Sequence, residues 1–371
     1  MRFVLILAVF VAVTASAVEN VKADFPTRPV QRVWFYNRPA NGNLDLLAKY
    51  FDYFILHKTE GATRDELTQR GVTAPFLAYV VMNQIHDPGS ATVVPRQGNV
   101  AWFTGDFQRL SREHPDWFLL DSKGRRVKKL EEGKYTHYFM DIGNPGFRDF
   151  WLERVITALQ DHGWNGVFID NADASLVRYQ KIDQVPAKYP TDENFQVAVK
   201  SFLSFINVRL RAKGLLAFAN ITGLKDPNVW FDYLESLDGA MQESFVVDWD
   251  TGYRSDSQWE EHLSRMERSQ AEGKRVICVA QGKENNKERQ EFAYASYLLI
   301  ASGKASFRYA SGCCYMYPWI YDNYAIDLGA PLGPRTFRDG VWQRSFSNGR
   351  VTVNLSEHKG QILVGNKQTA P

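Results

Sequence analysis

Two acidic residues close apolar segments of the chain, and this placement makes them the first candidates for chemistry. Asp170 follows the run Val167-Phe168-Ile169, and Glu243 closes the segment Leu237-Asp238-Gly239-Ala240-Met241-Gln242-Glu243. Because an ionised carboxylate is costly inside an apolar core, we expect each side chain to emerge where its strand ends. The alternatives are structural: Asp170 as a helix N-cap and Glu243 in a salt bridge at the rim.

The surroundings of the two acids differ, and this difference predicts different roles. The apolar run 245–247 follows Glu243, so we expect its pKa to be raised, whereas Asp170 stands beside Asn171 and Asp173 and is expected to be ionised. A protonated carboxyl group facing an ionised one is what glycosidic-bond hydrolysis needs, because one releases the leaving oxygen and the other acts as nucleophile or base. The pair therefore predicts a glycoside hydrolase. A carbohydrate-binding barrel without turnover is the competing hypothesis.

Further polar side chains fall at or near other predicted strand ends, and several such groups on one face would suit recognition of sugar hydroxyls. His57 has a core histidine as its alternative, Asp141 a turn, and Asp173 a cap or supporting role. We expect Trp102 near the bound sugar, since an aromatic face suits the C–H face of a pyranose. The predicted substrate-binding residues are Asn37, His57, Tyr79, Trp102, Asp141, Asn171, Asp173, Asn220, Gln281 and Arg308. Either stacking on sugar or packing of the C-terminal tail is predicted for Tyr315, Tyr317 and Trp319.

Other classes of chemistry lack their motifs. The sequence has no His-x-His, His-Glu-x-x-His or Cys-x-x-Cys, so it predicts no metal site and no cofactor, and it has no Gly-x-Ser-x-Gly nucleophile elbow. A net charge of +2 argues against nucleic acid as a partner. The one basic cluster is expected to be a solvated hairpin, or alternatively a contact for an acidic glycan; it comprises Lys123, Arg125, Arg126, Lys128 and Lys129 and precedes Glu131 and Glu132.

Alternating apolar segments must position these side chains. Eight strand-like segments are predicted at 33–36, 53–57, 76–81, 166–170, 215–220, 239–243, 276–280 and 305–309, and helical periodicity appears at 44–50, 64–70, 147–162, 194–213, 258–272 and 287–302. Alternation of this kind predicts an α/β fold, a (β/α)8 TIM barrel whose active site lies at the C-terminal mouth of the strands. An open doubly wound sheet is the alternative, weakened by the lack of a glycine-rich loop after any strand.

The remaining segments complete the predicted organisation. Residues 1–17 have the charge, apolar core and Ala15-Ser16-Ala17 end of a signal peptide, which predicts a secreted or periplasmic protein without stable membrane insertion. The barrel is assigned to 18–312, with a long insertion at 83–135 as one wall of the substrate cleft, and a small antiparallel β appendage to 313–371. Cys278 is expected to be buried, while Cys313 and Cys314 form either a vicinal disulfide or two thiols.

Several of these motifs occur together in one known group of proteins. The order Trp164-Asn165-Gly166-Val167-Phe168-Ile169-Asp170-Asn171, preceded by Asp141-Ile142-Gly143-Asn144-Pro145 and followed by Gln242-Glu243-Ser244-Phe245, resembles glycoside-hydrolase-like family 15. It is also similar to the related endo-α-1,4-polygalactosaminidase family. The resemblance runs over residues 32–309, and 344–354 look like the β tail of these barrels. It implies a TIM barrel, a carbohydrate substrate, and Asp170 and Glu243 as the acidic pair; it does not imply the sugar, the linkage or the oligomeric state.

Overall fold

The computed structural model describes residues 25–95, 98–131, 135–160, 163–249 and 251–365. The expected signal peptide at 1–17 lies outside the described residues. Eight parallel strands close into a barrel in the order β1-β11-β10-β9-β8-β7-β3-β2, which confirms the predicted (β/α)8 fold over the open sheet. These strands are β1 Gln31–Tyr36, β2 Tyr53–His57, β3 Phe76–Val81, β7 Gly166–Asp173, β8 Leu216–Thr222, β9 Gly239–Gln242, β10 Arg275–Gln281 and β11 Ala305–Ala310.

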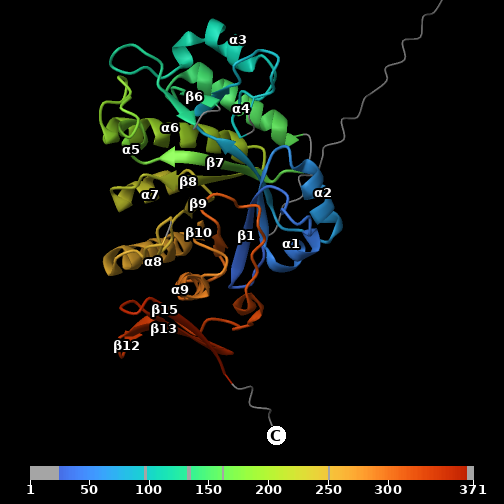
Figure 1. Cartoon of the computed structure of the whole chain (residues 1–371), viewed down its shortest axis with the longest axis vertical. Helices are drawn as coiled ribbons and strands as arrows, with labels where there is room; N and C mark the ends of the chain where they lie inside the picture. The colour runs from blue at the N-terminus through green and yellow to red at the C-terminus, as the bar shows by residue number, and fades with distance from the viewer. Residues whose placement is uncertain (1–24, 96–97, 132–134, 161–162, 250, 366–371) are drawn as a thin grey trace, which may run out of the picture.

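Helices cover the outside of the barrel (Figure 1). Capping residues explain where several of them begin: Thr191 caps α6, and Ser255 with Gln258 forms a capping box at α8. The helices predicted from periodicity all occur, with ends shifted by a few residues. The outer helices are α1 Leu44–Tyr50, α2 Gly61–Gln69, α4 Pro145–Gln160, α6 Asp192–Arg211, α7 Pro227–Leu234, α8 Asp256–Ala271 and α9 Lys287–Leu298, and the short α5 Val177–Gln180 follows β7.

Alternation along the strands divides the core into two layers. Val33 and Phe35 of β1 belong to the cluster inside the barrel, whereas Trp34 between them packs outward beneath the helices. The inner cluster continues with Phe168 of β7 and Met241 of β9, both fully buried. A filled barrel of this kind is not a pore, so any substrate must bind at its mouth.

The insertion between β3 and β7 builds a second, smaller sheet. Its strands β4 Gln84–Asp87, β6 Tyr135–Phe139 and β5 Lys128–Glu131 pair antiparallel in that order, with α3 Asp106–Glu113 and the 3-10 helix η1 Pro115–Trp117 between β4 and β5. Residues 119–127, before β5, form a tight turn: Leu120 and Arg126 make a bridge, the Asp121 amide donates to the Arg125 carbonyl oxygen, and the Val127 amide donates to that of Leu119, both at 2.8 Å.

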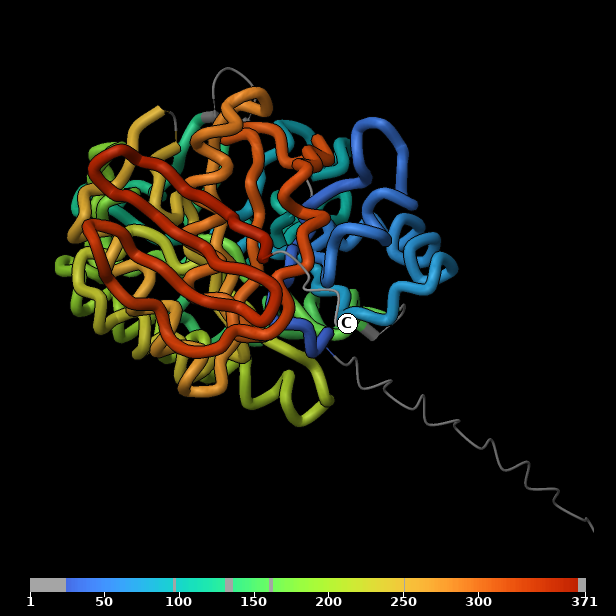
Figure 2. The backbone as a smooth tube through the Cα atoms, turned by 90° about the horizontal axis from the view of Figure 1, so that it is seen from below, coloured from blue at the N-terminus to red at the C-terminus, as the bar shows by residue number. Residues whose placement is uncertain are grey.

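The C-terminal tail forms the expected antiparallel sheet, with strands β12 Thr336–Arg338, β13 Val341–Phe346, β14 Gly349–Asn354 and β15 Lys359–Val364 after the 3-10 helix η2 Asp322–Ala325. It lies against α9, at the end of the molecule opposite α3 and β6 (Figures 1 and 2). Contact is close at Gly360, where an added Cβ would come within 2.5 Å of the Glu291 carbonyl oxygen and 2.6 Å of the Ala295 Cβ. The boundary between barrel and appendage at residue 312 stays a prediction.

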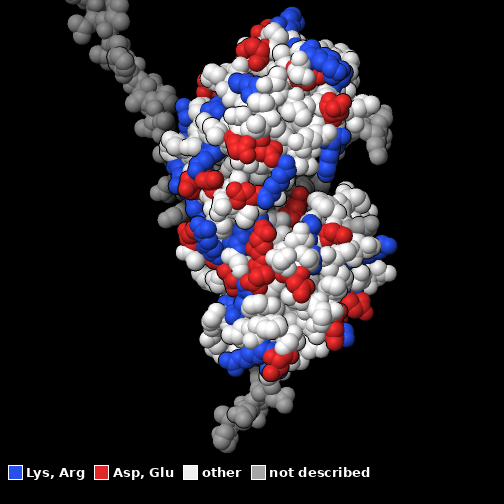
Figure 3. Space-filling model, turned by 90° about the vertical axis from the view of Figure 1, so that its left-hand side faces the viewer, with Lys and Arg blue, Asp and Glu red and all other residues white. Residues whose placement is uncertain are grey.

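The C-terminal ends of the barrel strands point to the left in Figure 1, as the arrowhead of β7 shows. This is the face turned to the viewer in Figure 3, where acidic and basic residues are interspersed and the surface is hollowed near its middle. Among the described residues, no helix is long and apolar enough to cross a membrane.

Candidate active site

Asp170 lies near the end of β7, on the rim that the sequence predicts. Tyr79, from β3, donates its hydroxyl to Asp170 Oδ2 at 2.6 Å, and Asn220, from β8, donates from Nδ2 to Oδ1 at 3.0 Å. Since β3 and β8 are the two neighbours of β7 in the barrel, strand pairing alone brings both donors to the carboxylate. The carboxylate is thus held from both sides.

Glu243 directly follows β9 and lies beside the same amide. Asn220 Nδ2 donates to Glu243 Oε2 at 3.0 Å, and the Tyr315 hydroxyl donates to Oε1 at 3.3 Å. Burial raises the pKa of Glu243 to about 7, and the negative charge of Asp170 adds to that rise, while the hydrogen bonds from Asn220 and Tyr315 oppose it. Glu243 is therefore a carboxyl group that can hold a proton near neutral pH.

One nitrogen connects the two acids. Because Asn220 Nδ2 lies 3.0 Å from an oxygen of each, Asp170 Oδ1 and Glu243 Oε2 are at most 6.0 Å apart. An amide nitrogen carries two hydrogens, so Asn220 can serve both carboxylates at once. The two acids thus share one site at the mouth of the barrel.

The chain turns sharply just after each acid. Asn171 has φ of +62° and Ser244 has φ of +54°, and Val246 is also left-handed at +54°. Asparagine tolerates this region, but a β-branched valine does so only when its surroundings impose it. After Glu243 they do: Gln281 Oε1 accepts from the Ser244 amide at 3.1 Å and His262 Nδ1 accepts from the Val246 amide at 3.2 Å.

An ion pair between buried Asp173 and half-buried Arg178 supports β7 beyond Asp170. Arg178 donates from Nε and Nη2 to the two oxygens of Asp173 at 2.8 and 2.9 Å, and from Nη2 to Asn171 Oδ1 at 2.7 Å. Thr222 donates its hydroxyl to the same Asp173 at 2.6 Å. Burial alone would lower the pKa of Arg178, yet Asp173 outweighs it and the pKa is raised. Asp173 therefore has the supporting role that the sequence offered as its alternative.

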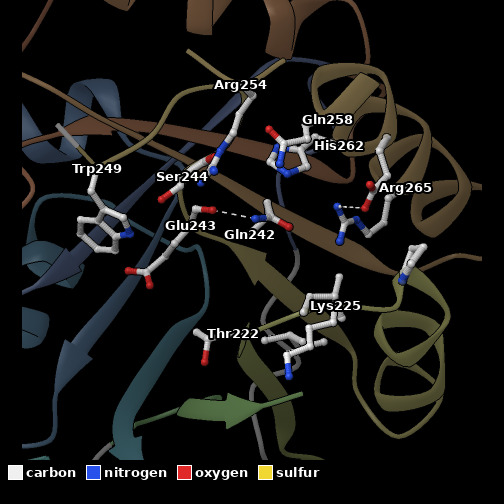
Figure 4. Close-up of a pocket in the computed structure, with 15 residues that line it drawn as sticks. Thr222, Lys225, Gln242, Glu243, Ser244, Trp249, Arg254, Gln258, His262 and Arg265 are labelled. Carbon is white, nitrogen blue, oxygen red and sulfur yellow. Dashed lines mark hydrogen bonds and ion pairs between the residues drawn. The ribbon is translucent and has the colours of Figure 1, made fainter. Parts of the chain in front are cut away.

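Two hollows adjoin the acids. The first, which we call the Asp170 pocket, has a volume of about 610 Å³ and is lined by Tyr36, Asn37, His57, Tyr79, Val81, Gln84, Asn99, Lys129, His137, Asp170, Asn171, Arg178, Cys313, Cys314, Tyr315 and Met316. The second, the Glu243 pocket, has a volume of about 420 Å³ and includes Thr222, Lys225, Trp249, Arg254 and His262. In Figure 4 the Glu243 carboxylate points toward the space between Trp249 and Thr222, away from Arg254 and His262. Both volumes fall in the usual range for ligand sites.

The structure brings most of the predicted site residues to this region. Asn37, His57, Tyr79 and Asn171 line the Asp170 pocket, and Asn220 bridges the acids. Two other predicted residues, Gln281 and Arg308, contact the segment that carries Tyr315. Gln281 contacts Tyr315, its Nε2 lying 3.4 Å from the hydroxyl, and Arg308 donates from Nη2 to the Tyr315 and Tyr317 carbonyl oxygens at 3.0 Å each.

Two predicted binding residues are not brought to either pocket. Trp102 is 7% exposed, and the Lys58 ammonium lies 3.7 Å from its ring centroid. Asp141 accepts from Lys188 Nζ at 2.6 Å and from the Tyr189 hydroxyl at 2.5 Å, so this carboxylate fixes the loop after β6. Neither residue lines the Asp170 or the Glu243 pocket, and a role of either in substrate binding stays a prediction.

Other site residues escaped the sequence reasoning. Trp249 is 47% exposed and lines the Glu243 pocket; its position six residues after Glu243, on the loop of the same strand, was the available signal. Arg178 lies in the short helix α5, five residues after Asp173, where a basic partner for that acid could have been sought. Tyr315 was predicted either to stack on sugar or to pack the tail, and nothing in the spacing indicates that it would donate to Glu243, seventy-two positions away.

The basic cluster of the insertion is divided. Arg125 is exposed and pairs with Asp121 at 2.7 Å, whereas Arg126 is half-buried and lies over the Phe118 ring at 3.7 Å. Lys129, in contrast, lines the Asp170 pocket. One cation of the five therefore reaches the candidate site.

The model of hypothetical glycosyl hydrolase family 15 matches residues 90–350. The chain belongs to this family. Membership places it among the glycoside hydrolases, and the match covers both acids, the insertion from residue 90 onward, and β12 and β13 of the C-terminal sheet. A search of curated proteins finds no match.

Solved structures agree on the fold of this family 15 chain. The glycoside hydrolase domain of PelA from Pseudomonas aeruginosa is 18% identical, with 78% of this chain and 96% of that domain covered and a TM-score of 0.50. The α-galactosidase TtGalA from Thermus thermophilus is 13% identical, with 91% and 68% covered and a TM-score of 0.51. A dextranase from Flavobacterium johnsoniae is 8% identical, with 79% and 37% covered and a TM-score of 0.52. At such identities the likeness shows the barrel and not the substrate.

Proposed function

We propose that this family 15 protein hydrolyses the glycosidic bonds of a polysaccharide or oligosaccharide, with Asp170 as nucleophile and Glu243 as acid and base. The observation that carries the proposal is the pair itself: two carboxylates share the Asn220 amide, and burial raises the pKa of Glu243 to about 7. Enzymes that invert the anomeric centre separate their acids by about 6.5–9.5 Å to admit a water, and retaining enzymes by about 5–5.5 Å. An upper limit of 6.0 Å between the facing oxygens favours retention.

The first step forms a glycosyl-enzyme ester. Protonated Glu243 gives its proton to the glycosidic oxygen as the bond from that oxygen to the anomeric carbon breaks. A carboxylate oxygen of Asp170 forms the new bond to the anomeric carbon, and the leaving sugar departs as an alcohol. Tyr79 and Asn220 orient Asp170 for this attack.

In the second step, water hydrolyses the glycosyl-enzyme ester. Glu243, now ionised, takes a proton from water as the water oxygen bonds to the anomeric carbon, and the carbon–oxygen bond to Asp170 breaks. Both acids return to their starting states, and the sugar keeps its configuration after two inversions. Tyr315 and Asn220 stabilise the ionised form of Glu243 between the steps.

We include export in the proposal. The apolar segment near the N-terminus and the small residues Ala15, Ser16 and Ala17 support a signal peptide, and a polysaccharide outside the cell would be reached by an exported enzyme.

The test is a screen of the purified protein against polysaccharides, with the anomer of the first product followed by NMR. We expect hydrolysis of at least one polymer with retained configuration, and its loss in Asp170→Asn. Glu261→Gln is the matched control, because Glu261 lines the Glu243 pocket but pairs with Arg265 at 3.0 Å. Binding without cleavage by the wild type would instead support a non-catalytic barrel, and an inverted product would overturn the role of Asp170 as nucleophile.

A further inference from the structure

A disulfide between adjacent residues forms part of the wall of the Asp170 pocket. Cys313 and Cys314 are bonded, which decides between the two states that the sequence left open. Both line the pocket, with Cys313 exposed and Cys314 half-buried, and the exposed Met316 adds a third sulfur to the same wall. Disulfide sulfurs carry no proton, so their contribution here is a contact surface of polarisable atoms.

The segment that carries these sulfurs is fixed in place. Arg308, which is buried, donates to the carbonyl oxygens of Tyr315 and Tyr317, and the Ala40 amide donates to that of Met316 at 2.8 Å. The Tyr315 side chain reaches Glu243 from the same segment. A wall held by these bonds is already ordered before any ligand arrives, which reduces the entropy cost of binding.

The other walls of the Asp170 pocket have a different character. The sulfur segment follows β11, which adjoins β1, whereas the insertion grows from β3, on the far side of β2. The insertion contributes Gln84, Lys129 and His137 to the lining. The pocket is therefore amphipathic, with sulfur at one side and nitrogen- and oxygen-bearing side chains at the other.

We propose that the Cys313–Cys314 disulfide is the contact platform for the apolar face of a pyranose ring in the subsite beside Asp170; this inference rests on the proposed function. A pyranose presents C–H groups on its faces and hydroxyls around its edge. The sulfurs contact the C–H face by dispersion, and the insertion side of the pocket binds the hydroxyls. Reduction replaces the bonded pair by two thiols that rotate separately and carry weak donors, so the platform is lost.

A purely positioning role of the disulfide makes a different prediction. Cys314 directly precedes Tyr315, so the bond could act by holding Tyr315 against Glu243. In that case its loss would change kcat and move the alkaline limb of the pH–rate profile, because that hydrogen bond lowers the pKa of Glu243. A platform instead acts on KM and leaves both kcat and the limb unchanged.

The experiment compares the oxidised enzyme, the same enzyme treated with the phosphine TCEP, and Cys313→Ser/Cys314→Ser. The TCEP phosphorus takes an oxygen atom from water and becomes the phosphine oxide, while the disulfide takes up the two electrons of the phosphorus and the two protons of that water to give two thiols. The probes are short oligosaccharides of polygalactosamine, chitin, amylose and pectin. We expect KM on the cleaved probe to rise about three- to tenfold on reduction and in the double variant, with kcat and the pH limb unchanged. TCEP should have no further effect on the double variant, which is the internal control.

Two results would overturn the platform while leaving the proposed function intact: an unchanged KM after verified reduction, or a shifted alkaline limb at constant KM. If the oxidised enzyme cleaves no glycan of this panel or of the polysaccharide screen, the proposed function fails and the platform falls with it. Circular dichroism of the double variant verifies that the barrel is folded, and reduction of the wild type tests the platform without any substitution.

Discussion

The ends of β7 and β9 present two carboxylates in similar geometry but in different surroundings. Asp170 and Glu243 each accept two hydrogen bonds, and each is followed by a residue with positive φ. Beyond Asp170 the strand continues into the Asp173–Arg178 ion pair, whereas beyond Glu243 the chain enters the buried apolar run 245–247. Burial next to an existing negative charge gives Glu243 its raised pKa, so environment and not geometry separates the two roles.

Removing either carboxylate should have the largest effect. We expect Asp170→Asn to lower kcat by about 10⁴-fold or more, because no other group can form the ester, and Glu243→Gln to lower it by about 10²–10⁴-fold. Both variants should fold, since an amide can keep hydrogen bonds with the same neighbours. Steady-state kinetics checks the prediction.

A substrate with a good leaving group, such as an aryl glycoside, separates the roles. It needs little protonation, so Glu243→Gln should recover much of the first step on it, and Asp170→Asn should not. If the aryl glycoside instead restored the first step in Asp170→Asn, Asp170 would be the acid and Glu243 the nucleophile.

The sequence predicted the acids and the barrel because both depend on local pattern. Alternation within each strand fixes which side chains face inward, and an acid that ends such a strand must emerge at the mouth. The burial of Trp102 could not be predicted from local pattern. It depends on packing that joins distant segments, with Lys58 from another part of the chain over its ring. The contact from Tyr315 to Glu243 likewise joins segments that only the closed barrel brings together.

The next largest effect should come from breaking the ion pair between Asp173 and Arg178 on the β7 side, and it should lower the free energy of unfolding. Asp173 is buried, so Arg178→Met leaves a charge without its main partner and is expected to lower the free energy of unfolding by about 3 kcal/mol. Arg178→Lys keeps a charge and should lose less. Urea unfolding followed by circular dichroism measures both. Equal stability of Arg178→Met and wild type would show that Thr222 alone satisfies Asp173.

On the β9 side, removing the acid should stabilise the protein at high pH, whereas removing Arg178 on the β7 side should destabilise it. The folded protein binds the proton of Glu243 more tightly than the unfolded chain, whose glutamate pKa is about 4.3. This contribution is complete below about pH 4 and is lost as the pH rises through about 7. A glutamine at position 243 does not ionise, so Glu243→Gln does not lose stability as the pH rises. Above pH 7 it should be more stable than wild type by about 1–3 kcal/mol.

Unfolding of both proteins at pH 5 and pH 8 tests this difference. The kcat/KM of the wild type should also fall above about pH 7, as the acid loses its proton. A flat stability difference between the two pH values would mean that Glu243 is as well solvated in the folded protein as in the unfolded chain.

The smallest effect on catalysis should come from an aromatic residue, Trp249, and a comparison with Trp102 would sharpen the contrast between the two sides. Trp249 is half exposed in the Glu243 pocket, so Trp249→Ala is expected to raise KM about three- to tenfold at nearly constant kcat. Trp102→Ala should leave KM unchanged and lower the free energy of unfolding instead, by about 3 kcal/mol, because that ring is buried in the insertion. Trp249→Phe keeps an aromatic face and should recover part of the loss. If instead only Trp102→Ala raised KM, the sugar would bind at Trp102 in the insertion, as the sequence predicts. The insertion would then have to open when substrate binds.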